Sequence, residues 1–281
     1  MPSQIGATSF RNTLEFIRKH LQQWLYLSFL GLSIPVIVFQ VVVALLGAKH
    51  ASNIRYIYDL GSITSVEILV SAIGGFVGSY LLAVLATGLV FGTSIFALVQ
   101  QGYNSGGELR IVLRRSVWLV FRKGLWLWFL LSLVLMILQF FEIIFFVVSS
   151  TVLMTPALIA KNSKDSVFRS IKAAITLSFG DGSGTSRWGI LFQLVSYASC
   201  LYLAFLGIQV AGSSLLRLDD FLPVSRDLFS NGIISLPYLG VTFFKGIFVG
   251  LSVGFYAVFT SQFLKLVEQR KEAALGDLSD S

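Results

Sequence analysis

The sequence predicts an all-α, polytopic membrane protein with six transmembrane helices and three amphipathic helices on the cytoplasmic membrane surface. Composition supports this fold class first, because 55% of the 281 residues are hydrophobic, 12% are charged and the mean hydropathy is +0.80. Several apolar runs exceed the roughly eighteen residues that indicate a spanning helix. Lys and Arg residues also cluster beside these runs, and a basic amphipathic segment precedes an apolar run three times.

The stretch from Leu125 to Ala160 is predicted to cross the membrane twice. Its thirty-six residues would make one helix of roughly 54 Å, whereas a hydrocarbon core is about 30 Å thick. Lys and Arg flank the stretch on both sides, and short basic flanks stay on the cytoplasmic side of a membrane. We therefore expect a hairpin that turns near Gln139 to Glu142.

The remaining spans are single apolar runs, and all six form one membrane domain over residues 1–267. Residues 228–244 are apolar but contain Asn231, Gly232 and Pro237, so they are expected to lie at the membrane interface. A charged segment, 268–281, is expected to be a flexible cytoplasmic tail. The predicted spans cover about residues 24–46, 68–99, 125–140, 143–160, 188–211 and 246–266.

Charge asymmetry predicts the orientation of this domain. Sixteen Lys and Arg residues fall in segments predicted to be cytoplasmic and four fall in segments predicted to be outside. This asymmetry places both termini in the cytoplasm and fits a multi-pass protein of the bacterial cytoplasmic (inner) membrane. The net charge of +7 is then explained by anionic lipid headgroups rather than by nucleic acid. Membrane lipids are the expected partners, with another membrane or peripheral protein as a further one.

Three segments, at residues 8–22, 107–122 and 164–178, have the apolar periodicity of amphipathic helices. Each stands immediately before a predicted span, as a repeated module of one surface helix and two spans. The cleanest apolar face belongs to the third segment, and consists of Val167, Phe168, Ile171, Ala174 and Ile175. The basic residues predicted to contact the lipid surface are Arg114, Arg115, Arg169 and Lys172.

Small residues at helical spacing predict where spans pack together. Glycines four residues apart let two helix backbones approach closely in lipid. The second span, 68–99, is the candidate for the central packing helix, and Pro35 is expected to kink the first span. The glycines expected to serve helix packing are Gly74, Gly78, Gly88, Gly92, Gly246, Gly250 and Gly254.

Residues suited to catalysis or metal binding are scarce. The two histidines, His20 and His50, are predicted on opposite sides of the membrane, and Cys200 is the single cysteine. Neither a zinc site nor a Ser-His-acid triad fits this distribution, so no catalytic residue, metal or cofactor is expected. Glu142 is the candidate polar membrane residue, because an ionisable group inside a membrane segment is often functional. The favoured explanation of Glu142 is nevertheless contact with headgroups or water at the hairpin turn.

The sequence resembles a six-span bacterial membrane-domain family, which includes the membrane domain attached to some glycerophosphodiester phosphodiesterases and stand-alone relatives. The resemblance rests on Ile5-Gly6, on Phe16-Ile17-Arg18-Lys19, on Pro35 and on the stretch from Pro156 to Gly180. In that stretch Pro156 matches, and Leu177 and Gly180 match if two residues are inserted. Lys161 replaces the family's acidic residue, and Ser170 and Ala174 stand at its Ala and Ser positions. The resemblance implies a fold and a compartment rather than an activity.

These observations lead to two functional hypotheses. The first is a non-enzymatic integral membrane protein that serves as a scaffold or as an accessory to lipid or envelope processes. The second is a small-solute or lipid transporter or channel component, suggested by the internal repetition, by Pro35 and Pro156, and by the glycine-bearing spans.

Overall fold

The computed structural model describes residues 4–42, 45, 66–104, 107–123, 155–159, 166–179, 207 and 236–279, and every element in these ranges is helical. Among the described residues, three helices are long and apolar enough to cross a membrane: Leu21–Val42, Leu81–Tyr103 and Thr242–Gln269. They correspond to the first, second and sixth predicted spans. The predicted span 125–140, all of 188–211 except Gly207, and most of 143–160 lie outside the described residues, as does Glu142.

The first span is built from three successive pieces. It begins with α2 (Leu21–Tyr26), continues through the π-helix η1 (Leu27–Ser33) and returns to α-helix over residues 34–42. Inside η1 the wider turn is visible in its bonds, since the backbone N–H of Ile34 donates to the carbonyl of Phe29. The Ser33 hydroxyl also donates to the carbonyl of Ser28, at 3.1 Å. The irregularity therefore lies in the turns just before Pro35, where the sequence predicts a kink.

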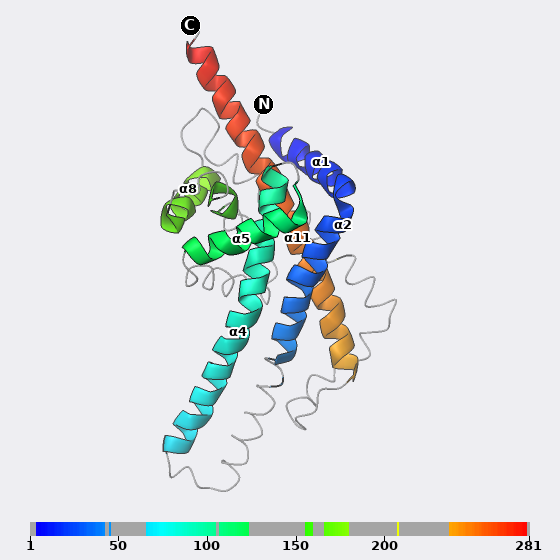
Figure 1. The fold of residues 1–281 in the computed structure, drawn as a ribbon, viewed down its shortest axis with the longest axis vertical. Coiled ribbons are helices and arrows are strands. Elements are labelled where there is room, and N and C mark those ends of the chain that lie inside the picture. Colours follow the sequence, from blue (N-terminus) through cyan, green and yellow to red (C-terminus); the bar gives the residue numbers. More distant parts are fainter. Residues whose placement is uncertain are drawn as a thin grey trace.

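The long helix α11 (Leu236–Ser279) runs beside the first span (Figure 1). It packs against α1 (Gln4–Lys19), η1 and α4 (Val66–Tyr103), and it is buried around most of its circumference. A helix that is apolar on all sides is suited to such a place. The second span, predicted to be the central packing helix, is buried in the carboxyl-terminal half of α4 and exposed at most described positions of the amino-terminal half.

Two predicted boundaries differ from the structure because α11 is continuous. Residues 236–244, predicted to be interfacial, form its first turns, with Pro237 in a position where a missing N–H is tolerated. The helix also runs to Ser279 through the residues predicted to form a flexible tail. That segment contains Glu272, Ala273, Ala274 and Leu275, which have high helix propensity.

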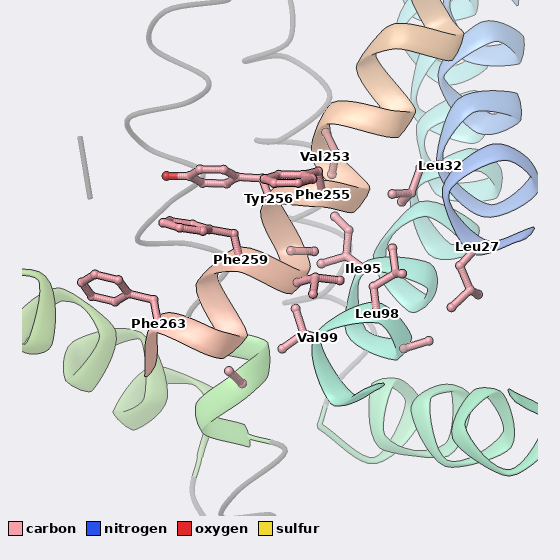
Figure 2. Packing of buried hydrophobic residues seen from close by; sticks show 14 of the residues in the cluster. Leu27, Leu32, Ile95, Leu98, Val99, Val253, Phe255, Tyr256, Phe259 and Phe263 are labelled. Atoms are coloured by element: carbon pink, nitrogen blue, oxygen red, sulfur yellow. The ribbon is translucent and has the colours of Figure 1, made fainter. Parts of the chain in front are cut away.

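The core of the described residues joins the three long helices. Figure 2 shows Leu27 and Leu32 of the first span facing Ile95, Leu98 and Val99 of α4 and Val253 of α11. On another face of α11, the rings of Tyr256, Phe259 and Phe263 form a row, with centroids 5.8 Å and then 6.2 Å apart. Each of these nine side chains is at most 2% exposed. Their burial in a continuous cluster fixes how the three helices cross.

Three shorter helices lie at one end of the long ones (Figure 1). They are α1, α5 (Leu109–Lys123) and α8 (Val167–Phe179), and they correspond to the three predicted amphipathic segments. α8 begins where Ser166 caps it, since the backbone N–H of Arg169 donates to Ser166 Oγ at 3.2 Å. Phe10 of α1 packs on Phe255 of α11, with ring centroids 5.8 Å apart. The carboxyl-terminal part of α11 lies at the same end.

Candidate functional site

The glycine stripe of α11 lies against the first span. A methyl group added at Gly246 would overlap the side chain of Ile37, and one added at Gly254 would overlap Ser28 Oγ. At Gly250 the added carbon would overlap the Ser33 hydroxyl and would also lie 2.6 Å from the Ser33 backbone nitrogen. Backbone cannot move aside as the end of a flexible side chain can. Any side chain at Gly250 would therefore force the two helices apart.

Glycine–serine contacts also join α4 to both of the other long helices. A methyl group at Gly31 would overlap Ser94 Oγ, and one at Gly102 would overlap Ser261 Oγ. The Ser94 and Ser261 hydroxyls donate to carbonyls of their own helices, to Val90 at 2.8 Å and to Val258 at 2.6 Å. Because these hydroxyls are satisfied locally, both serines can face a glycine without a partner across the interface. The sequence analysis did not single out Gly31 or Gly102.

The other predicted packing glycines lie on α4 and differ among themselves. Gly74 and Gly78 are exposed, and a methyl group at either would meet no described residue within 4 Å. Gly88 and Gly92 are buried in the carboxyl-terminal half of the same helix. Only that half of α4 therefore has the close surroundings that the glycine spacing predicts.

The four predicted lipid-contact residues are all exposed, with Arg114 and Arg115 on α5 and Arg169 and Lys172 on α8. Large apolar side chains are exposed beside them. On α5, Trp118 is 56% exposed and Phe121 is 60% exposed, and the Arg122 guanidinium lies 4.9 Å from the centre of the Trp118 ring. These two helices therefore present basic and aromatic groups together.

The predicted apolar face of α8 is divided in the structure. Val167 and Ala174 are buried, and Ile171 packs against the cluster that contains Phe96 and Val167. Phe168, by contrast, is 75% exposed and Ile175 is 45% exposed. One stripe of the helix thus packs on the protein, and a neighbouring stripe leaves apolar side chains uncovered.

Buried amides link the three long helices close to this basic end. Gln101 Nε2 of α4 donates to Gln23 Oε1 of α2 at 2.9 Å. Gln262 Nε2 of α11 donates to the Gly102 carbonyl at 2.6 Å, and the Tyr103 hydroxyl donates to Glu268 Oε2 at 2.6 Å. These bonds tie the end of α4 to both neighbouring helices, which is a common use of polar side chains inside membrane bundles.

Two groups in this amide cluster have no hydrogen-bond partner in the part of the chain that the structure describes. They are Gln100 Nε2 and Gln101 Oε1, and their residues are 2% and 1% exposed. The sequence analysis ended the second span at Val99 and placed both glutamines outside it. The helix instead continues to Tyr103 and carries them into the bundle. The feature of the sequence that could have indicated these buried amides is the pair of consecutive glutamines directly after an apolar run.

A polar cavity of about 350 Å³ lies between the end of α1 and the carboxyl-terminal part of α11. Its wall contains charged, amide and imidazole groups as well as the apolar side chains of Phe16 and Leu266. His20 Nε2 is buried and has no hydrogen-bond partner among the described residues. The polar lining consists of Asn12, Glu15, Lys19, His20, Gln262, Lys265 and Gln269.

Metal ligation is not favoured by the described residues, which contain no group of three or more His, Cys, Asp and Glu side chains that could hold an ion. Glu142 lies outside the described ranges, so its predicted place at a hairpin turn stays a prediction. No protein-family model matches this chain, and comparisons with the curated proteins and with the solved structures find no match.

Proposed function

We propose that this chain is a multi-pass protein of the bacterial cytoplasmic membrane, with both termini in the cytoplasm. It has no catalytic activity of its own and serves as a scaffold or accessory in lipid or envelope processes. Its basic surface helices rest on the anionic inner leaflet. The resemblance to the six-span membrane-domain family is part of this proposal.

The observation that carries the proposal is the distribution of positive charge along the bundle. The helices at one end (α1, α5, α8 and the carboxyl-terminal part of α11) carry every described Lys and Arg except Lys245 (Figure 1). Lys245 lies in the opposite half of α11, at the level where Gly246 meets Ile37. Basic residues at the ends of spans are retained on the cytoplasmic side, so this end is assigned to the cytoplasm.

Exposed apolar side chains on α5 and α8 support contact with lipid rather than with water alone. Phe121 and Phe168 stand beside basic residues on helices that lie across the long ones. A helix with this composition lies in the membrane interface, with its apolar side chains at the acyl boundary. Each basic residue near an anionic surface contributes about 1 kcal/mol of attraction.

The buried polar residues support a scaffold role rather than an enzymatic one. The described residues that combine burial with polarity are amides and hydroxyls, and these serve to join helices. A purified protein that turned over a lipid or a phosphodiester, and lost that activity when one polar residue was changed, would refute this part of the proposal.

The lipid-surface role can be tested with a spin label at position 168 in a variant that lacks the native thiol, Phe168→Cys/Cys200→Ala. In nanodiscs that contain anionic lipid, the label should be accessible to oxygen and shielded from a water-soluble nickel reagent. Adding Arg169→Glu/Lys172→Glu to this variant should move the label toward water. High salt should likewise move the label toward water in the variant without the two glutamates.

The matched control keeps the charge and exchanges the side chains, Arg169→Lys/Lys172→Arg, and the label should stay at its original depth. Equal water accessibility of the label in anionic and neutral nanodiscs, with and without the glutamates, would contradict contact between α8 and anionic lipid.

A further inference from the structure

An open groove of about 590 Å³ lies between the start of the first span and the first turns of α5. It shares no lining residue with the pocket between α1 and α11. Its volume is within the range of sites that take small molecules. One wall consists of Gln22, Gln23 and Tyr26, and the other consists of Glu108, Leu109, Arg110 and Leu113.

The groove lies where the first span begins. Gln22 is the second residue of the span Leu21–Val42, and at a rise of about 1.5 Å per residue Tyr26 lies about 6 Å further along the helix. The headgroup layer on each side of a hydrocarbon core is about 5–7 Å thick, so the wall matches it in height. In the proposed orientation this is the cytoplasmic headgroup layer, and the inference therefore rests on the proposed function.

The wall from α5 carries one negative and one positive group. Glu108 is the only acidic residue among residues 107–123, and its side chain and that of Arg110 are exposed. Neither side chain forms an ion pair or a hydrogen bond in the part of the chain that the structure describes. Residues two positions apart do not face each other on a helix, so both charges stay available to a ligand. A ligand that carries a cation and an anion complements this wall.

The other side chains of the groove suit the neutral parts of such a ligand. Leu109 and Leu113 add apolar surface, and the Tyr26 side chain, which is 50% exposed, offers an aromatic face to a cation. The exposed Gln22 amide adds a donor and an acceptor. Gln23 is held in the wall by the hydrogen bond from Gln101 Nε2, at 2.9 Å. The groove thus combines apolar sides with a paired set of charges.

We propose that this groove binds the headgroup of phosphatidylethanolamine. The ammonium group would donate hydrogen bonds to Glu108, and the phosphate would accept them from Arg110. The trimethylammonium group of phosphatidylcholine has no N–H to donate, and phosphatidylglycerol has no cation for Glu108. Free phosphoethanolamine has the same charged groups, but a lipid reaches a groove at this depth from within the leaflet.

The test uses the full-length protein in nanodiscs with equal amounts of phosphatidylethanolamine and phosphatidylcholine that have the same acyl chains. Native mass spectrometry of the released protein identifies the retained lipid. The wild-type protein should retain one phosphatidylethanolamine in preference to phosphatidylcholine. Glu108→Gln should lower the ratio of the two retained lipids about tenfold, the effect of losing one charge-assisted hydrogen bond. Arg110→Gln should lower retention of both lipids together, because both carry the phosphate.

The controls remove the same charges from exposed sites of α1 that lie outside the groove. Glu15→Gln and Arg18→Gln should each retain the two lipids in the wild-type ratio. A further variant keeps every charge and fills the groove instead. Gln22 is exposed at its edge, so Gln22→Trp should prevent retention of both lipids.

A separate arm tests the source of the headgroup. Free phosphoethanolamine is added to the protein in phosphatidylcholine nanodiscs, and the thermal unfolding midpoint is measured. A rise of the midpoint, without selective retention of phosphatidylethanolamine in the first experiment, would show that the groove takes a soluble ligand and would overturn the lipid source.

Equal retention of the two lipids by the wild type, or the same ratio for the wild type and Glu108→Gln, would overturn the proposal. So would preferential retention of phosphatidylglycerol when it replaces phosphatidylcholine. The depth of the label at position 168 is an independent measurement, made with anionic lipid. If the label behaves as expected and the groove does not select phosphatidylethanolamine, the inference fails while the proposed function stands.

Discussion

Two glycine stripes with the same four-residue spacing have opposite surroundings. Gly246, Gly250 and Gly254 of α11 lie against Ile37, Ser33 and Ser28 of the first span, whereas Gly74 and Gly78 of α4 are exposed, with no described residue within 4 Å of an added methyl group. The spacing alone therefore does not identify a helix contact. What distinguishes the two is the opposing helix, which in the first case offers serines and a π-helical turn.

The largest difference in the free energy of unfolding is expected when one glycine of each stripe is replaced by leucine. Gly250→Leu should lower the free energy of unfolding by about 3 kcal/mol, the upper part of the range for overpacking, because the new side chain meets the Ser33 backbone. Gly74→Leu should leave it within about 0.5 kcal/mol of the wild type, as at other uncrowded positions. Equilibrium unfolding in mixed detergent micelles measures both. Equal destabilisation by the two leucines would remove the distinction between the stripes.

A smaller loss of the free energy of unfolding is expected when an amide that joins these helices is removed. Gln101→Leu removes the hydrogen bond to Gln23 and should lower the free energy of unfolding by about 1 kcal/mol. The neighbouring Gln22 is exposed, so Gln22→Leu is the matched control and should have little effect.

A double-mutant cycle with Gln23→Leu isolates the pair, and a coupling of about 0.6 kcal/mol is expected for a hydrogen bond between spans. Additive losses from the two single variants would mean that the amides stabilise the bundle separately. The contact between the first span and α4 would then depend on close packing, such as that of Gly31 against Ser94, and not on the amide pair.

Much of the helical layout could be predicted from the sequence. The amphipathic periodicity located α1, α5 and α8 within a few residues, and the apolar runs located the three described spans. The continuity of α11 was not predicted, because Pro237 and a charged tail were taken as breaks. Pro237 instead lies in the first turn of the helix, and the tail contains strong helix formers.

The candidate sites were harder to predict, because they depend on contacts between distant segments. Gln23 and Gln101 are far apart in the chain, and neither apolar periodicity nor charge shows that they meet. The apolar face of α8 was predicted as one surface, but tertiary packing covers Val167 and Ala174 and leaves Phe168 exposed. Likewise, nothing local to His20 or Lys265 indicates that α1 and α11 line an open pocket between them.

The most direct test of the proposed membrane placement uses the two ends of one helix. α4 runs from Val66 to Tyr103, so cysteines at Glu67 and Asn104, in separate Cys200→Ala variants, report on opposite ends of the bundle. In intact cells a membrane-impermeant maleimide should label Glu67→Cys and should label Asn104→Cys only after the cells are opened. Labelling of Asn104→Cys in intact cells, or of both cysteines from the same side, would contradict the assignment of the basic end to the cytoplasm.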